Sequence, residues 1–228
     1  TFLGLTQAGD VTSWGAVAGA DGILGGRMTS VSPDSLPVPI AQLHGASSLA
    51  ATSSLFKGQG GALGGPSRCE TGIVPPGGGN TPHGHACAIV GGAVSCWGKS
   101  DFGALCTGFP DIQALPAAAP VESKSAWPQQ VAVGDEITCV RMTDGTVQCC
   151  GDDTAGRLGT EKVSLYSALF VPADAFVGHA VHVSASNRAV CALVQGGTVE
   201  CWGGNAHGEL GMSAPDDAAH PSPSKVAF

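Results

Sequence analysis

The feature that most constrains this chain is one phrase that occurs three times in register. In its last copy, Cys191 and Cys201 stand near the outer ends of two short apolar stretches joined by a glycine turn at residues 195–197. Trp202-Gly203 and a second turn at residues 208–211 follow. The earlier copies occupy residues 137–159 and 85–106. A chain that repeats itself is interpreted first as a repeat architecture.

A partial copy at the start of the chain has Leu3 and Ser13 at the cysteine positions, and residues 40–65 hold an eroded copy without a tryptophan. The Gly-x-Leu turns that close the copies begin at residues 22, 61, 103, 156 and 208, a spacing typical of propeller blades. Short apolar stretches, frequent Gly and Pro and the lack of helical periodicity predict strands. We predict an all-β fold, a β-propeller of four-stranded antiparallel blades.

About five units are visible, and we expect them to form a single domain over residues 1–228. The units lie near residues 1–36, 37–72, 73–120, 121–172 and 173–228. The chain ends in mid-unit at both termini, so we expect residues 226–228 to form a strand beside residues 1–5. The C-terminal strand would then complete the N-terminal blade and remove an open sheet edge. A fragment of a longer repeat protein is the alternative.

The cysteines predict disulfides within hairpins. Directly opposed residues of a tight antiparallel hairpin lie close enough for a disulfide. The glycine turns then oppose Cys87 to Cys96, Cys139 to Cys149 and Cys191 to Cys201. A shorter turn at residues 144–145 would oppose Cys139 to Cys150 instead. We prefer Cys149, because Cys150 occupies the tryptophan position of the other copies.

Three of the nine cysteines remain: Cys69, Cys106 and Cys150. We expect a Cys69–Cys106 disulfide and a buried free thiol at Cys150. Regular cysteine pairing indicates an oxidising compartment, so we expect a secreted or cell-surface protein. No Cys-x-x-Cys pair is present, which disfavours a metal site built from these residues.

Charge and hydropathy exclude several partner classes. The net charge is −8 with only 10 Lys and Arg, so we expect no nucleic-acid partner and no binding to an anionic membrane. No run of 18 apolar residues is present, which predicts no membrane insertion. The chain starts at Thr1 without a leader-like segment, as expected of a mature or trimmed product.

No constellation of residues indicates catalysis, a cofactor or a metal. There is no nucleophile elbow, phosphate loop or zinc protease pattern. Several histidine and acidic groups are better explained as loop, turn or capping residues: His83 and His85, His179 and His182, Asp152 and Asp153, and Asp216 and Asp217 before His220. Trp14, Trp97 and Trp202 recur once per copy and are expected to pack between blades. Trp127 lies outside the repeat, where it is a candidate anchor for a partner.

The phrase Cys-Ala-Leu, Gly-Thr-Val-x-Cys-Trp-Gly and Gly-x-Leu-Gly resembles the repeat of the regulator of chromosome condensation family. It is most similar to secreted bacterial-type members with paired cysteines. This resemblance implies a propeller, usually of seven blades, and interaction roles: nucleotide exchange on a small GTPase in the nuclear member, enzyme inhibition in a secreted member. Contact residues for these roles do not match position by position.

We therefore expect a non-enzymatic, secreted or cell-surface protein-interaction module with an unidentified protein partner. Loops at the rims of the ring are the expected contact surface, above all residues 66–84, 107–129 and 160–180. Three alternatives stay open: a self-assembling subunit of an extracellular filament or surface layer, an inhibitor of a secreted enzyme, and a metal-dependent hydrolase or lyase on a propeller scaffold.

Overall fold

The computed structural model describes residues 2–15, 25, 34–52, 84–109, 112–212 and 214–227. Every regular element in this part of the chain is a β-strand, so the all-β prediction is confirmed. The strands are β1 (Phe2–Leu5), β2 (Val11–Gly15), β3 (Asp34–Pro39), β4 (Ala46–Ala51), β5 (His85–Val90), β6 (Ala93–Lys99), β7 (Ile112–Ala119), β8 (Pro128–Val133), β9 (Ile137–Met142), β10 (Val147–Asp152), β11 (Tyr166–Pro172), β12 (Ala180–Ala185), β13 (Ala189–Val194), β14 (Val199–Asn205) and β15 (Asp216–Lys225).

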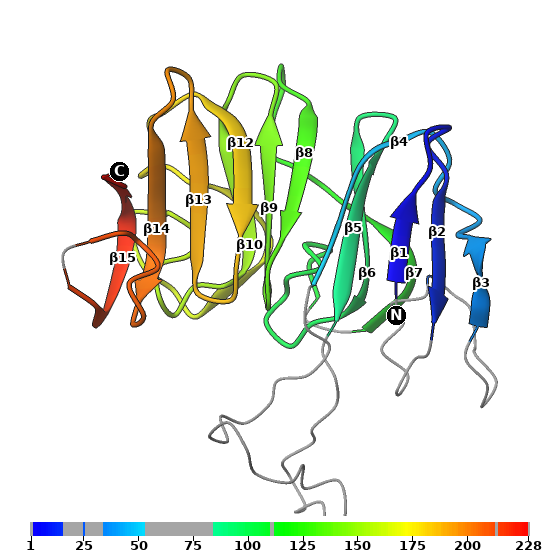
Figure 1. Ribbon diagram of the computed structural model, residues 1–228, viewed down its shortest axis with the longest axis horizontal. Coiled ribbons are helices and arrows are strands. Elements are labelled where there is room, and N and C mark those ends of the chain that lie inside the picture. Colours follow the sequence, from blue (N-terminus) through cyan, green and yellow to red (C-terminus); the bar gives the residue numbers. More distant parts are fainter. Residues whose placement is uncertain are drawn as a thin grey trace, which may run out of the picture.

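The strands form four antiparallel sheets, which we call blades 1 to 4. Blade 1 has the order β1-β2-β3, and the other three are four-stranded: β4 to β7, β8 to β11 and β12 to β15. The blades stand side by side in chain order, with the two chain ends at opposite ends of the row (Figure 1). Among the first strands of blades 2, 3 and 4, the middle one, β8, contacts both β4 and β12.

A glycine sets the same bend in each blade. Gly15, Gly98, Gly151 and Gly203 follow the tryptophan position and have φ values of 99°, 109°, 112° and 113°. At each of them the pairing with the outermost strand shifts register. A Cβ at Gly151 would lie 2.2 Å from the carbonyl oxygen of Glu136, so no side chain fits there. The Trp-Gly dipeptide is therefore a bulge with a backbone contact that needs glycine.

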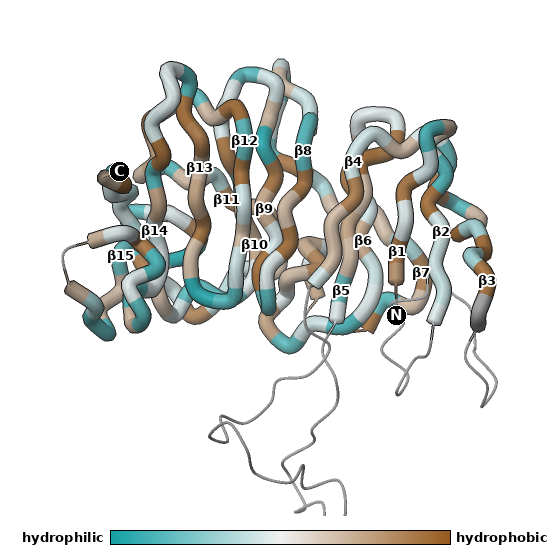
Figure 2. The backbone as a smooth tube through the Cα atoms, in the orientation of Figure 1, coloured by the Kyte–Doolittle hydropathy of each residue, from teal (hydrophilic) through white to brown (hydrophobic). Residues whose placement is uncertain are grey.

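The core lies between the blades. Blades 2 and 3 enclose one buried cluster that contains Ile89 and Phe170, and blades 3 and 4 enclose a second that contains Val183 and Trp202. A third, between blades 1 and 2, contains Trp97. Figure 2 shows hydrophobic residues along the strands and hydrophilic ones at many of the connecting loops. Each blade is thus stabilised mainly by packing against the blade or blades beside it.

The predicted closure of the chain ends is wrong. The last strand, β15, pairs with β14 in blade 4, and the N–H of Val226 donates to the carbonyl oxygen of Val199 at 3.0 Å. Strand β1 pairs only with β2 among the described strands. Thr1 and Phe228 lie outside the described residues. The repeated phrase specifies the central hairpin of a blade, but it does not specify which hairpin a flanking strand joins.

The eroded unit at residues 37–72 is not a separate sheet in the described part of the chain. Strand β4 pairs with β5 and so supplies the first strand of blade 2, while residues 40–43 lie in the turn before it. The boundary predicted at residue 73 therefore falls inside blade 2. Residues 55–58 and 61–64, which we expected to complete that unit, lie outside the described residues.

Candidate interaction surface

Each of blades 2 to 4 carries one disulfide across its central hairpin. The paired cysteines are direct register partners with Cα atoms 4.1 Å apart. The pairs are those that the hairpin register predicts: Cys87–Cys96, Cys139–Cys149 and Cys191–Cys201. In blade 1 the equivalent partners are Leu3 and Ser13, also as predicted. These local bridges make each hairpin rigid on its own.

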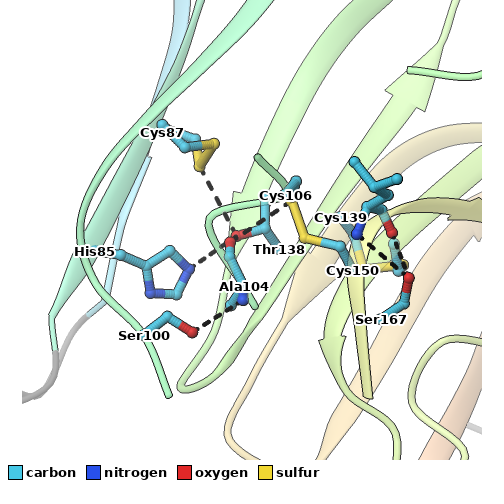
Figure 3. The surroundings of a disulfide bond; sticks show 12 residues. His85, Cys87, Ser100, Ala104, Cys106, Thr138, Cys139, Cys150 and Ser167 are labelled. Carbon is cyan, nitrogen blue, oxygen red and sulfur yellow. Dashed lines mark hydrogen bonds between the residues drawn. A yellow bond between two sulfur atoms is a disulfide. The ribbon is translucent and has the colours of Figure 1, made fainter. Parts of the chain in front are cut away.

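A fourth disulfide joins two blades. Cys106, in the turn after β6 of blade 2, pairs with Cys150 on β10 of blade 3, with Cα atoms 5.6 Å apart (Figure 3). The predicted Cys69–Cys106 pair and the predicted free thiol at Cys150 are therefore wrong. Cys69 lies outside the described residues.

The interface between blades 3 and 4 explains this pairing. There Trp202 holds the position of Cys150, and Gly159 holds the position of Cys106. The Trp202 indole N–H donates to the carbonyl oxygen of Arg157 at 2.9 Å, and a Cβ on Gly159 would lie 2.9 Å from that indole nitrogen. In the blade 2–3 interface Cys150 stands in place of the tryptophan. Cys106, with φ 55°, stands in place of the glycine. The sulfur bridge takes the place of the tryptophan.

Buried polar groups lie beside this bridge (Figure 3). The Thr138 hydroxyl donates to the carbonyl oxygen of Ala104 at 2.7 Å, and His85 Nε2 lies 2.8 Å from the same hydroxyl oxygen. The Ser100 hydroxyl donates to the Glu136 carboxylate at 2.9 Å. Burial lowers the pKa of His85 to about 4, only partly opposed by a hydrogen bond to the Ile137 backbone. His85 is therefore neutral at pH 7 and belongs to the interior of the blade interface.

Arg157 is a structural residue that the sequence patterns did not single out. Its guanidinium is buried between blades 3 and 4, where it pairs with the Asp152 carboxylate and donates to the carbonyl oxygens of Asp135 and Asn187. Asp153 accepts from the N–H groups of Leu158 and Ser164, and this turn chemistry was expected for the Asp152-Asp153 pair. The arginine of the Gly-x-Leu-Gly turn was the available signal, because that turn closes onto the next blade.

Large apolar side chains are exposed over the outermost strand of blade 3. We define the β11 surface as Phe109, Leu165, Tyr166 and Leu169, of which Leu165 is 73% and Phe109 is 67% exposed. The loop that carries Phe109 lies on this strand, because the Gly108 N–H donates to the carbonyl oxygen of Ala168 at 2.8 Å. Exposed apolar patches of this kind mark contact surfaces.

The edge of β11 also differs from the other outermost strands. Strands β3, β7 and β15 have proline inside their bounds, at Pro37, Pro116, and Pro221 and Pro223 respectively, whereas the only proline of β11 is its last residue, Pro172. Proline removes a backbone donor and blocks pairing at a sheet edge. Of the three inserts expected as contact loops, 107–129 contains β7 and 160–180 contains β11, so these two hold outer strands and not only rim loops. Residues 66–83 of the third insert lie outside the described residues.

Trp127 is exposed, as expected, with 65% of its surface accessible. It precedes β8, and its backbone is held by Thr143, whose N–H donates to the Trp127 carbonyl oxygen at 2.9 Å. A fixed backbone with an exposed indole suits an anchor residue.

The histidine and acidic groups form pairs rather than a converging site. His220 Nε2 lies 2.7 Å from Asp216, and this hydrogen bond is the main reason that the pKa of Asp216 is lowered. His182 contacts Gln130 on the neighbouring inner strand. His83 lies outside the described residues. Within the described part of the chain, no group of three or more His, Cys, Asp or Glu could hold a metal ion.

The sheets and disulfides together define the class of fold. It is a β-propeller fold with disulfides inside three hairpins and one disulfide between blades 2 and 3. Residues 129–157 match the family model described as the Regulator of chromosome condensation (RCC1) repeat. Among the described residues there is no helix of the length and apolar character needed to span a membrane.

Solved structures give the same fold. Yeast RCC1 (Prp20) in its complex with Kap60 is 16% identical, with a TM-score of 0.71 over 99% of this chain and 46% of that chain. Prp20p from Saccharomyces cerevisiae, studied for its binding to Gsp1p and histones, is 18% identical, with a TM-score of 0.72 over 99% and 48%. Human WBSCR16 is 16% identical, with a TM-score of 0.70 over 99% and 49%.

Residues 129–157 are therefore similar to the RCC1 repeat, and the chain has the fold of the RCC1 propellers. It spans about half the length of the solved propellers that it matches.

Proposed function

We propose that this chain is a non-enzymatic protein-interaction module that works outside the reducing cytosol and binds its partner through the β11 surface. The observation that carries the proposal is the coincidence of exposed apolar side chains with the one outermost strand that has no internal proline. Leu165 and Tyr166 supply apolar contact area. The backbone groups of β11 that are not already bonded to β10, to Gly108 or to the Ser167 hydroxyl can pair with an extended segment of the partner. The rest of the blade is a rigid support.

Protein is the partner class that this surface suits. Yeast Prp20 has been crystallised with a protein, Kap60, which supports a binding role for the fold. The net charge of −8 disfavours nucleic acid. Catalysis would need titratable groups gathered at one place, and the described ones are spread in pairs over the blades.

The compartment is proposed from cysteine chemistry. Four disulfides use eight of the nine cysteines. Three of these four disulfides are fully buried. Such crosslinks persist in oxidising environments and are rare in the cytosol. This chemistry supports our proposal that the protein is secreted or exposed at the cell surface.

The test is affinity capture from the native extracellular fraction with three forms of the chain. The double variant Leu165→Arg with Leu169→Arg puts two charges on the β11 surface. The control, Val177→Arg, charges a residue that is 95% exposed in the loop between β11 and β12. We expect the unmodified chain and Val177→Arg to capture the same protein in equal amount. The double variant should capture at least ten-fold less of it. Equal capture by the double variant, with its fold intact by circular dichroism, would show that the partner binds elsewhere.

A further inference from the structure

The β11 surface is made by two blades. Leu165, Tyr166 and Leu169 lie in blade 3, on β11 or directly before it. Phe109 comes from the other blade, because it ends the turn at residues 103–109 that follows β6 of blade 2. The place of Phe109 on this surface therefore depends on how that turn is held against blade 3.

The turn is seated on β11 by close backbone contacts. A Cβ on Gly103 would lie 2.6 Å from the Cα of Ala168, so only glycine fits there. The Gly108 N–H donates to the carbonyl oxygen of Ala168 at 2.8 Å. A Cβ on Gly108 would lie 3.7 Å from Cδ2 of Leu169. Phe109 follows directly, so its backbone starts from a point that is fixed beside β11.

The turn does not hold this position by its own contacts alone. Cys106 has φ 55°, a conformation that non-glycine residues rarely adopt. The Thr107 hydroxyl oxygen is buried without a hydrogen-bond partner among the described residues, which opposes burial of the turn. The Cys106–Cys150 disulfide holds the turn in place (Figure 3). Cys150 lies on β10 between the partners of Ser167 and Val171, so the bridge ends on the strand next to β11.

The equivalent turn between blades 3 and 4 has no disulfide and is held differently. There Gly156 is seated on β15, since its Cβ would lie 2.8 Å from the Pro221 nitrogen. Glu161 holds the position of Gly108, and no backbone hydrogen bond joins Glu161 to β15 in the described part of the chain. Of these two turns, only the one with the disulfide continues along the outer strand.

We propose, on the basis of the function proposed above, that the Cys106–Cys150 disulfide positions Phe109 so that a protein partner binds blades 2 and 3 together. Phe109 contacts the partner, and Cys106 and Cys150 are positioning residues that act through it. A side chain that is ordered before binding loses less conformational entropy when the partner arrives. Loss of the bridge therefore weakens binding although every residue of the β11 surface is still present.

Hydrogen exchange of the Gly108 amide tests the positioning without a partner. The bridge is removed by Cys150→Ser, which leaves the sequence of the turn unchanged. Every form carries Cys69→Ser, so that the freed Cys106 thiol has no unpaired cysteine to join. We expect the Gly108 amide to exchange at least about ten-fold faster than in the bridged form. The Ala180 amide, which is hydrogen-bonded at the blade 3–4 interface, should change less than about two-fold.

The matched control removes a disulfide that does not touch the turn. Cys191→Ser with Cys201→Ser deletes the bridge inside blade 4, and the exchange of the Gly108 amide should stay as in the bridged form. Equal exchange in the bridged and Cys150→Ser forms would overturn the proposal. So would an equally large acceleration of Gly108 exchange in the control.

Affinity capture from the native extracellular fraction tests the effect on binding. Phe109→Ala should capture at least about five-fold less of the protein that the unmodified chain captures. Val177→Ala, at a position that is 95% exposed, should capture an equal amount. Cys150→Ser should lose about as much as Phe109→Ala, and the two changes together no more than about two-fold beyond Phe109→Ala alone. Losses that multiply would show that the bridge does not act through Phe109, and would overturn the proposal.

Two variants separate failure of this proposal from failure of the β11 surface. Full capture by Leu165→Arg with Leu169→Arg would overturn the β11 surface itself. Loss of capture by that double variant, together with full capture by Phe109→Ala, would leave the β11 surface standing and overturn the role of Phe109. Phe109→Ala changes an exposed side chain and no cysteine, so this result does not depend on the folding of Cys150→Ser.

Discussion

Blade 3 meets its two neighbours through equivalent positions that are filled by different chemistry. Toward blade 4 the contact is Trp202 on Gly159, with the buried Arg157 ion pair beside it. Toward blade 2 it is the Cys106–Cys150 disulfide, with the neutral His85 and its polar neighbours. One interface depends on apolar burial and a permanent charge, and the other on a covalent bond and a titratable group. The same fold can therefore be weakened at two places by different treatments.

The largest effect is expected from Trp202→Ala, which empties the centre of the blade 3–4 interface. Truncation of a fully buried tryptophan costs about 3–5 kcal/mol of unfolding free energy, because a cavity replaces the indole. Trp127→Ala is the matched control, since that indole is exposed. Denaturant unfolding followed by circular dichroism measures both. A similar loss for the two variants would mean that tryptophan content, and not the interface, decides stability.

Loss of the covalent interface is expected to cost less. Cys106→Gly removes the bridge and should lower the free energy of unfolding by about 2–4 kcal/mol. The double variant Cys106→Gly with Cys150→Trp converts the blade 2–3 interface to the chemistry of blades 3 and 4, so it should recover part of that loss. Non-reducing unfolding curves compare the two. If the added tryptophan destabilises the chain further, the two interfaces are not interchangeable.

Acid should weaken the blade 2–3 interface in particular. Burial lowers the pKa of His85 from 6.5 to about 4, so between these values the unfolded chain binds a proton that the folded chain does not. The free energy of unfolding therefore falls as pH decreases through this window, by up to about 1.4 kcal/mol per pH unit from this residue. His85→Gln should remove that part of the slope, whereas His44→Gln, at an exposed position, should not. Parallel curves for wild type and His85→Gln would contradict the assignment.

The smallest effect is expected at a partly exposed ion pair of blade 4. Arg188 lies 3.8 Å from Glu209, and its side chain is about half exposed, so Arg188→Ala should cost less than about 1 kcal/mol. The buried Arg157 shows what the same residue type does when the next blade covers it. A loss above about 2 kcal/mol for Arg188→Ala, measured by thermal unfolding, would show that Arg188 contributes more than this one exposed pair.

The hairpins and their disulfides were predictable because both depend on short sequence separations. Cys87 and Cys96 are nine residues apart, and the glycine turn between them leaves few registers. The bridge between blades was missed, although Cys106 stood in a glycine position and Cys150 in a tryptophan position of the repeat. Read as a pair, these two departures were the available signal. Strand β11 was not predicted, because residues 160–180 show no clear alternation of apolar and polar residues.

By itself, the sequence determined the repeating unit: a glycine-bent hairpin, its internal crosslink and a Trp-Gly bulge, since these follow from residues close together in the chain. Only the tertiary structure decided which flanking strand joins which hairpin, as when β4 pairs with β5 across 33 intervening residues. It alone also decided that Cys150 meets Cys106. The physical reason is that packing between blades is settled by which surfaces become buried together, and similar units carry similar surfaces, so local pattern cannot choose among them.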